Sequence, residues 1–130
     1  MKYSRSNKSV FNIGYHLIWC PKYRRKVLVN NIEKRLIELL KKKAKEIAIF
    51  IEKMEIKPDH VHLFVKASPL ISPHKIVQQF KGYTSRTLRQ EFRELRSKIP
   101  TLGTRSYYCE SIGHISEKTI LKYIEDQRNK

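Results

Sequence analysis

The stretch Pro58-Asp59-His60-Val61-His62-Leu63-Phe64-Val65 decides the fold class and carries the first chemical signal of the chain. Apolar and polar residues alternate in it, which is typical of a strand, and residues i and i+2 of a strand share one face. His60 and His62 are therefore expected side by side on one face, with the apolar residues packed on the other. Because imidazole is a common metal ligand, the pair would supply half of a coordination sphere. Taken alone, the pattern has a second interpretation that fits equally well: both histidines lie on a strand and bind no ligand.

Strands and helices alternate on both sides of this stretch. Strand patterns cover residues 11–19, 49–57, 61–66 and 107–112, and helix patterns start at Asn30, Ser72 and Ser116 as N-caps. Asn30 is followed by Glu33 at the third helical position, which predicts a capping box. Lys57-Pro58-Asp59 is short enough for a hairpin turn between two of the strands.

This order predicts an α+β fold with a ferredoxin-like, or RRM-like, β-α-β-β-α-β antiparallel sheet and an additional C-terminal helix that carries Tyr123. A chain of 130 residues is one domain by length. We expect the sheet and its two helices over about 8–113, and the last helix over about 116–128.

The charge of the chain limits its partners. Lys and Arg number 28 against 12 acidic residues, a formal net charge of +16, and the basic residues are spread through the elements. This distribution indicates a folded surface that binds nucleic acid. No segment approaches the ~18 apolar residues of a membrane span, no signal-peptide pattern opens the chain, and the two cysteines lack zinc or disulfide-framework spacing. We therefore expect a cytoplasmic protein with no membrane partner.

The C-terminal helix carries a second chemical signal. Tyr123 and Gln127 are four residues apart and are therefore neighbours on one helix face. Ile120 and Ile124 lie on the adjoining stripe and would dock the helix on the sheet, so the hydroxyl of Tyr123 could reach outward. A tyrosine at the margin of an amphipathic helix is more often a packing residue. The pattern alone leaves both roles open.

Four separated motifs resemble the HUH single-tyrosine transposases, the small TnpA-type enzymes of insertion sequences that move as single-stranded DNA. They are YHLIWCPKYRR at 15–25, PDHVH at 58–62, FKGYTSR at 80–86 and YIEDQ at 123–127. The motifs stand in the family's order and span nearly the whole chain, which makes the resemblance specific. It implies a DNA transposase and strand transferase that acts on single-stranded DNA with hairpins at the element ends.

The resemblance also implies roles for residues. Tyr123 would be the nucleophile that forms a 5′-phosphotyrosine and releases a 3′-hydroxyl, so that no nucleotide triphosphate is needed. His60 and His62, with Gln127 as third ligand, would hold a divalent metal, Mg²⁺ or Mn²⁺, that polarises the phosphate. Nitrogen and amide ligands suit Mn²⁺, whereas the family generally works with Mg²⁺. The general base for the tyrosine is not identified by the sequence.

The resembled family also implies a homodimer. Its first strands pair across the dimer to extend the sheet, and residues 11–19 have the apolar, β-branched character expected of such an edge. The tyrosine helix of one subunit would then lie against the histidine pair of the other.

Two clusters mix cations with an aromatic ring, as proteins that bind single-stranded nucleic acid do. They consist of Lys22, Tyr23, Arg24 and Arg25, and of Lys81, Gly82, Tyr83 and Arg86. The alternative for the first cluster is a solvated loop. A glycine inside a helix costs about 1 kcal/mol relative to alanine, so Gly82 suggests close approach of a backbone or a phosphate.

The remaining polar residues near the motifs have plainer interpretations. His16 alternates with apolar strand residues and is expected to pack or to lie near DNA rather than to bind metal. His74 in a first helical turn is expected to be exposed or to contact a phosphate. Asp59 could support a ligand imidazole through a hydrogen bond, or simply form the turn before the strand.

Three alternatives to an active transposase stay open. One is a domesticated or non-mobile HUH nuclease. Another is a non-catalytic module that binds single-stranded nucleic acid, although the RNP pattern of aromatic residues found in RNA-recognition domains is absent. The third is a metal-dependent phosphodiesterase that uses water, in which Tyr123 is only structural.

Overall fold

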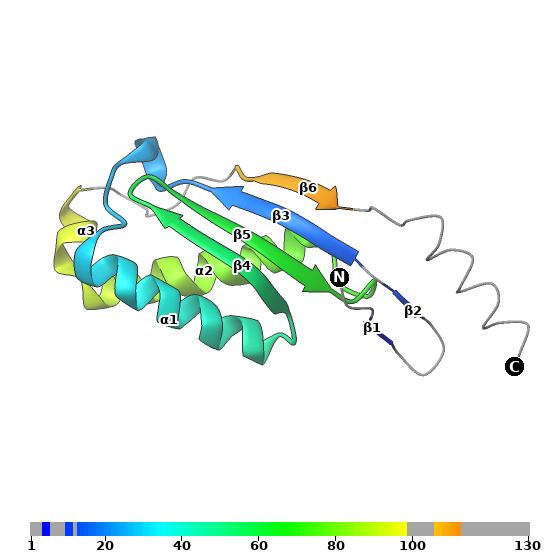
Figure 1. The fold of residues 1–130 in the computed structure, drawn as a ribbon. Coiled ribbons are helices and arrows are strands. Elements are labelled where there is room, and N and C mark those ends of the chain that lie inside the picture. Colours follow the sequence, from blue (N-terminus) through cyan, green and yellow to red (C-terminus); the bar gives the residue numbers. More distant parts are fainter. Residues whose placement is uncertain (1–3, 6–9, 12, 99–105, 113–130) are drawn as a thin grey trace, which may run out of the picture.

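The alternating stretch forms the second strand of a hairpin in the computed structural model, which describes residues 4–5, 10–11, 13–98 and 106–112. The elements are β1 (Ser4–Arg5), β2 (Val10–Phe11), β3 (Ile13–Trp19), η1 (Lys22–Arg24), α1 (Asn30–Glu46), β4 (Phe50–Lys57), β5 (His60–Ala67), α2 (Pro73–Glu91), α3 (Arg93–Lys98) and β6 (Tyr108–Ile112). From β3 onward this is the predicted order with the short helices η1 and α3 added, so the α+β fold is confirmed (Figure 1). The predicted helix at 116–128 lies outside the described residues.

The main sheet is four-stranded and antiparallel, in the order β4-β5-β3-β6. Leu17 on β3 pairs with Leu63 on β5 at one side and with Cys109 on β6 at the other. The prediction that residues 11–19 provide a free edge for dimer pairing is therefore wrong for 14–18, because these residues are paired with β5 on one side and with β6 on the other. Among the described strands, β4 and β6 form the two edges.

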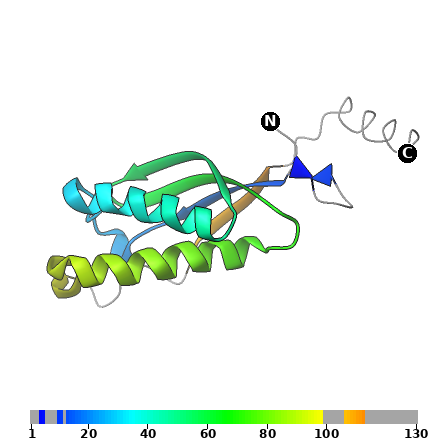
Figure 2. The same ribbon diagram turned by 90° about the horizontal axis from the view of Figure 1, so that it is seen from below.

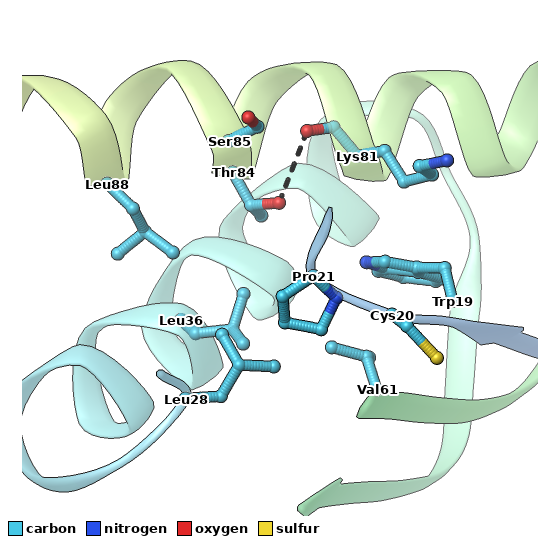
Figure 3. Close-up of a pocket in the computed structure, with 10 residues that line it drawn as sticks. All are labelled: Trp19, Cys20, Pro21, Leu28, Leu36, Val61, Lys81, Thr84, Ser85 and Leu88. Atoms are coloured by element: carbon cyan, nitrogen blue, oxygen red, sulfur yellow. Dashed lines mark hydrogen bonds between the residues drawn. The ribbon is translucent and has the colours of Figure 1, made fainter. Parts of the chain in front are cut away.

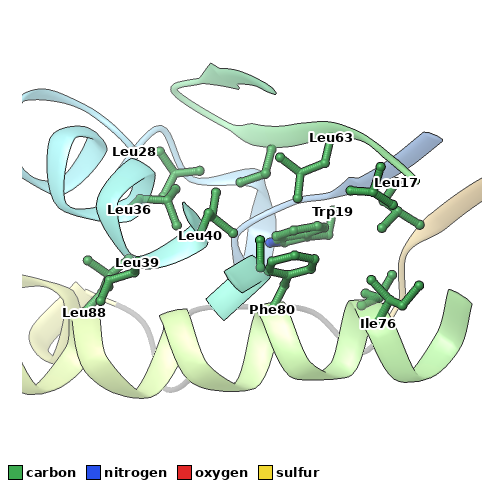
Figure 4. Close-up of a cluster of buried hydrophobic side chains, with 14 of the residues drawn as sticks. Leu17, Trp19, Leu28, Leu36, Leu39, Leu40, Leu63, Ile76, Phe80 and Leu88 are labelled. Atoms are coloured by element: carbon green, nitrogen blue, oxygen red, sulfur yellow. The ribbon is translucent and has the colours of Figure 1, made fainter. Parts of the chain in front are cut away.

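Both long helices cover the same face of the sheet, as Figure 2 shows for α1 and α2. The core lies between the two layers, where Trp19 stacks on Phe80 with ring centroids 6.4 Å apart (Figure 4). On β5 the alternate residues Val61, Leu63 and Val65 are at most 1% exposed, as the sequence predicted. The opposite face of the sheet, with both motif histidines, is not covered by any described helix (Figures 1 and 2).

The two helix starts differ in how well the sequence predicted them. Ser72 caps α2 as expected, with its Oγ accepting a hydrogen bond from the Lys75 amide at 3.2 Å. The predicted cap at Asn30 is wrong: Val29 is the N-cap of α1, no side chain caps this helix start, and the Val29 carbonyl accepts from the Ile32 amide. Asn30 instead takes φ 54°, a left-handed conformation that asparagine tolerates in turns. It turns the chain into the helix rather than capping it.

Within the described part of the chain, no helix is both long and apolar enough to cross a membrane.

Candidate metal and nucleic-acid site

The β4–β5 hairpin places His60 and His62 on the open face of the sheet. His60 is the first residue of β5, and the side chains of His60 and His62 are 33% and 32% exposed. Val61 between them is buried in the core at 1% exposure, so the strand that carries both imidazoles is anchored from its other face. Two rings with solvent access on a fixed strand are suited to bind a ligand.

Asp59 fixes the ring of His60. Its Oδ1 lies 2.9 Å from Nδ1 of His60, and its Oδ2 accepts a hydrogen bond from Arg24 at 3.2 Å. The hydrogen bond to His60 is the main cause that lowers the pKa of Asp59, and the charge of Arg24 adds to it. Asp59 thus forms the turn and also contacts the imidazole, as in the carboxylate–histidine pairs that orient metal ligands. The ring nitrogen left available on His60 is Nε2.

His62 has different neighbours. Its Nε2 lies 3.0 Å from Nδ1 of His16 on β3, and its Nδ1 lies 3.8 Å from Oε2 of Glu55 on β4. Burial is the main cause that lowers the pKa of His62, and the nearby His16 is the next. A lowered pKa favours the neutral imidazole, which is the form that binds metals. His16 also stacks on Phe64, so it packs as the sequence predicted.

Two imidazoles that face solvent fit a divalent transition-metal ion such as Mn²⁺. Within the described residues, no three His, Cys, Asp or Glu side chains are grouped closely enough to hold a metal ion by themselves. A third ligand from elsewhere is therefore needed. Gln127 and Tyr123 lie outside the described residues, and their assignments as ligand and nucleophile stay predictions.

The first basic cluster adjoins the histidines. The short helix η1, which begins two residues after the end of β3, consists of Lys22, Tyr23 and Arg24, and Arg25 follows it as an exposed residue. Tyr23 is 68% exposed and has φ 61°, with Nζ of Lys22 5.5 Å from its ring centroid. The ion pair between Arg24 and Asp59 links this cluster to the turn before His60. An exposed ring between cations is what a single-stranded nucleic acid needs for stacking and phosphate contacts.

The second cluster lies on α2, which covers the other face of the sheet, so the structure does not bring it to the histidines (Figure 2). Gly82 and Arg86 are exposed, whereas Tyr83 packs on the core with Nζ of Lys43 4.6 Å from its ring centroid. A Cβ at Gly82 would meet no atom within 4 Å. The prediction that another part of the protein backbone approaches Gly82 closely is therefore wrong. The prediction that a phosphate contacts Gly82 stays a prediction.

A small pocket lies between α2 and the end of β3 (Figure 3). Lys81 lies beside it, and the Nζ of Lys81 donates a hydrogen bond to the Ser106 carbonyl at 3.2 Å. Burial lowers the pKa of Lys81. The pocket holds about 20 Å³, enough for one water molecule, and half of its lining residues belong to the hydrophobic core. It is too small for a nucleobase.

The arrangement of the sheet and helices matches that of solved structures from one class of proteins. A crystal structure of a candidate transposase from Deinococcus radiodurans R1 matches with a TM-score of 0.78 at 30% identity, over 95% of this chain and 97% of that chain. A REP-associated tyrosine transposase bound to a REP hairpin has the same fold, with a TM-score of 0.61 at 10% identity over 94% and 68% of the two chains. The fold is that of the tyrosine transposases.

The sequence comparisons give the family. A family model described as "Transposase IS200 like" matches residues 9–127, and the chain belongs to this family. The ISDra2 transposase TnpA of Deinococcus radiodurans is 34% identical over 123 residues, which cover 93% of this chain and 88% of the relative. The transposase for insertion sequence element IS200 of Salmonella typhimurium is 28% identical over 119 residues, covering 90% and 78%. The resemblance seen in the four motifs is thereby confirmed.

Proposed function

We propose that this transposase cuts and rejoins single-stranded DNA at insertion-sequence ends through a 5′-phosphotyrosine at Tyr123. The hydroxyl oxygen of Tyr123 attacks a DNA phosphorus, a P–O bond breaks, and a 3′-hydroxyl leaves with the proton that balances the exchange. A 3′-hydroxyl of another strand can then attack the phosphotyrosine and restore the tyrosine. The observation that carries the proposal is the histidine pair on the open sheet face, with the ring of His60 held by Asp59.

The residues around the reacting phosphate have separate tasks. His60, His62 and Gln127 would hold Mg²⁺ or Mn²⁺, and the bound cation would supply charge withdrawal from the phosphate. Asp59 keeps Nδ1 of His60 engaged and so leaves Nε2 available to a ligand. The cluster of Lys22, Tyr23, Arg24 and Arg25, next to the Asp59 turn, binds the backbone and bases of the incoming strand.

A covalent adduct tests the nucleophile. Wild-type protein incubated with Mn²⁺ and single-stranded DNA should give a protein–DNA band on a denaturing gel, and Tyr123→Phe should give none while it keeps DNA affinity within about twofold. The matched control is Tyr108→Phe, which removes an exposed hydroxyl on β6 and should leave the adduct unchanged. Adduct formation by Tyr123→Phe would refute this nucleophile. DNA hydrolysis without an adduct would indicate the water-using phosphodiesterase, and binding alone would indicate a non-catalytic module.

We also propose that the enzyme is a homodimer that binds hairpins at both element ends. Transposition must hold two DNA ends, and a two-fold dimer duplicates the single tyrosine and histidine pair of one chain. Support for hairpin binding comes from the REP-associated transposase of the same fold, which was solved with a hairpin. Since β3 is paired on both sides, the contact between subunits cannot be an extension of the sheet at β3.

Mixing two inactive variants tests whether the dimer shares its sites. Tyr123→Phe and the double variant His60→Ala/His62→Ala should each be inactive alone. If the tyrosine of one subunit serves the histidines of the other, mixed dimers regain one intact site and cleavage returns. If mixed dimers form, as shown by pull-down of differently tagged subunits, and cleavage stays absent, each site is built within one chain.

A further inference from the structure

Gly82 lies at an exposed position in the middle of α2, where the described fold does not require a glycine. Phe80 and Thr84, two residues to either side, are buried against the core, so Gly82 is on the outer face of the helix. A Cβ added at Gly82 would meet no atom within 4 Å, and alanine is the better helix former. No packing contact among the described residues therefore explains this glycine. Close approach of a ligand to the helix backbone is a remaining physical reason for it.

The outer face of α2 has the charge that a polyanion needs. Apart from Gly82, the exposed residues of this helix are His74, Lys75, Gln78, Arg86, Gln90 and Glu91. Glu91 is the only acidic residue of α2, and it ends the helix in an ion pair with Arg35 on α1. Gln78 and Arg86 lie one turn to either side of Gly82 on the same face. Charge complementarity therefore favours a polyanion on this face, whereas two copies of α2 would repel each other there.

No exposed tyrosine, phenylalanine or tryptophan lies on α2, which distinguishes this helix from the first basic cluster. Tyr23 in that cluster is 68% exposed, whereas on α2 Tyr83 packs on the core and Phe80 is fully buried. Single strands gain affinity when their bases stack on exposed rings. In paired DNA the bases stack on one another, and a protein contacts the phosphates and the groove edges instead. The outer face of α2 is therefore suited to paired DNA, and the first basic cluster to single strands.

We propose that the outer face of α2 binds the double-stranded stem of the DNA hairpin, with the sugar–phosphate backbone closest to the helix at Gly82. This inference rests on the proposed function and assigns the paired part of the DNA to a surface of its own. Arg86 supplies a guanidinium to a phosphate beside Gly82, and Gln78 supplies an amide. Because α2 covers the face of the sheet opposite to His60 and His62 (Figure 2), stem binding and strand cleavage use opposite sides of the sheet.

A methyl group at Gly82 tests the close approach, because it should change stability and stem affinity in opposite directions. Gly82→Ala should raise the midpoint of thermal unfolding by about 3 °C, since alanine favours the helix and its Cβ meets open space. The dissociation constant for a blunt-ended DNA hairpin should rise about threefold or more in Gly82→Ala and about tenfold or more in Gly82→Leu. The dissociation constant for unstructured oligothymidylate should stay within about twofold in both variants. Fluorescence anisotropy in EDTA measures both affinities without metal.

Removal of one positive charge gives an independent test with a matched control. In the full chain, Arg86→Ala should reduce the slope of log K against log salt for the hairpin by about 0.9, the value for one phosphate contact to a duplex. The slope for oligothymidylate should stay unchanged. Arg25→Ala removes the same charge from the first basic cluster and should do the reverse. It should reduce the slope for oligothymidylate and leave the slope for the hairpin unchanged.

The outcomes separate this inference from the function on which it rests. If the Gly82 and Arg86 variants bind the hairpin as wild type does, or if they weaken binding of both DNAs equally, the outer face of α2 is not the stem surface. If Gly82→Ala keeps its hairpin affinity but changes the oligomeric state in sedimentation velocity, α2 contacts another subunit instead. If the wild-type protein binds oligothymidylate but not the hairpin, hairpin recognition in the proposed function is wrong as well.

Discussion

At the scale of single residues, the two histidines of one motif are held in opposite ways. A carboxylate holds Nδ1 of His60 and leaves Nε2 available, whereas another imidazole holds Nε2 of His62. The sequence predicted that both rings share one face and that Asp59 could support one of them. It did not predict the contact with His16, because the partner of a strand residue depends on sheet register, which no local pattern specifies.

The ion pair between Arg35 on α1 and Glu91 on α2 predicts a pH-dependent contribution to stability. The guanidinium donates two hydrogen bonds to the carboxylate, at 2.8 and 3.0 Å, and these lower the pKa of Glu91 below its ordinary value of 4.5. The carboxylate of Glu91 binds a proton less tightly in the folded state than in the unfolded chain. The ion pair therefore stabilises the protein above pH 4.5 and loses this effect as the pH falls through the lowered pKa of Glu91. The pair is exposed, so its contribution is small.

We therefore expect Glu91→Gln to lower the urea midpoint slightly at pH 7. The difference from wild type should stay constant down to about pH 5.5 and disappear as the pH falls below 4.5. Chemical unfolding followed by circular dichroism between pH 2.5 and 7 measures it. A midpoint difference that persists unchanged at pH 2.5 would show that Glu91 acts through packing instead.

At the scale of elements, the strands were predictable and the start of α1 was not. All four predicted strands of the main sheet have boundaries within two residues of those observed, because alternation of apolar residues reflects which face is buried. Asn30 failed as a predicted cap because the chain reversal before α1 places it in a left-handed conformation, a tertiary constraint with no local signature. The C-terminal helix, with Tyr123 and Gln127, stays a prediction.

The contact between α2 and the sheet predicts a large effect of one core residue. Phe80 is fully buried and stacks on Trp19, so Phe80→Ala would remove a ring and leave a cavity between the two layers (Figure 4). We expect a loss of about 3–5 kcal/mol in the free energy of unfolding, a large part of the 5–15 kcal/mol typical of a domain. Urea denaturation measures it. Leu70→Ala is the control: this residue is 95% exposed, and its truncation should change stability by less than about 0.5 kcal/mol.

At the scale of the whole molecule, the net charge of +16 sets how DNA affinity depends on salt. Arg25 and Arg35 provide a matched pair of positive charges. Arg25 is exposed in the first basic cluster, next to the turn that precedes His60. Arg35 on α1 instead donates a hydrogen bond to Glu91 on α2. Removal of one positive charge at Arg25 and at Arg35 is therefore expected to change the salt dependence of DNA affinity differently.

Arg25→Ala should weaken binding of single-stranded DNA and reduce the slope of log K against log salt by about 0.7, the value for one lost phosphate contact. Arg35→Ala lowers the net charge by the same amount and should leave the slope unchanged. Fluorescence anisotropy titrations between 50 and 400 mM NaCl measure both slopes. Equal slopes for the two variants would mean that the first basic cluster contributes only to the overall charge and does not contact DNA.

The strand order has a consequence for how the protein is made. β3 begins at Ile13, yet one of its two neighbours, β6, ends at Ile112. While a ribosome is still translating the chain, β3 can join β4 and β5, but its other edge keeps unpaired amides and carbonyls until β6 emerges. Such an exposed edge attracts strands of other chains. Chains that end before Tyr108 and so lack β6 are therefore expected to aggregate. Chains that extend past β6 are expected not to aggregate.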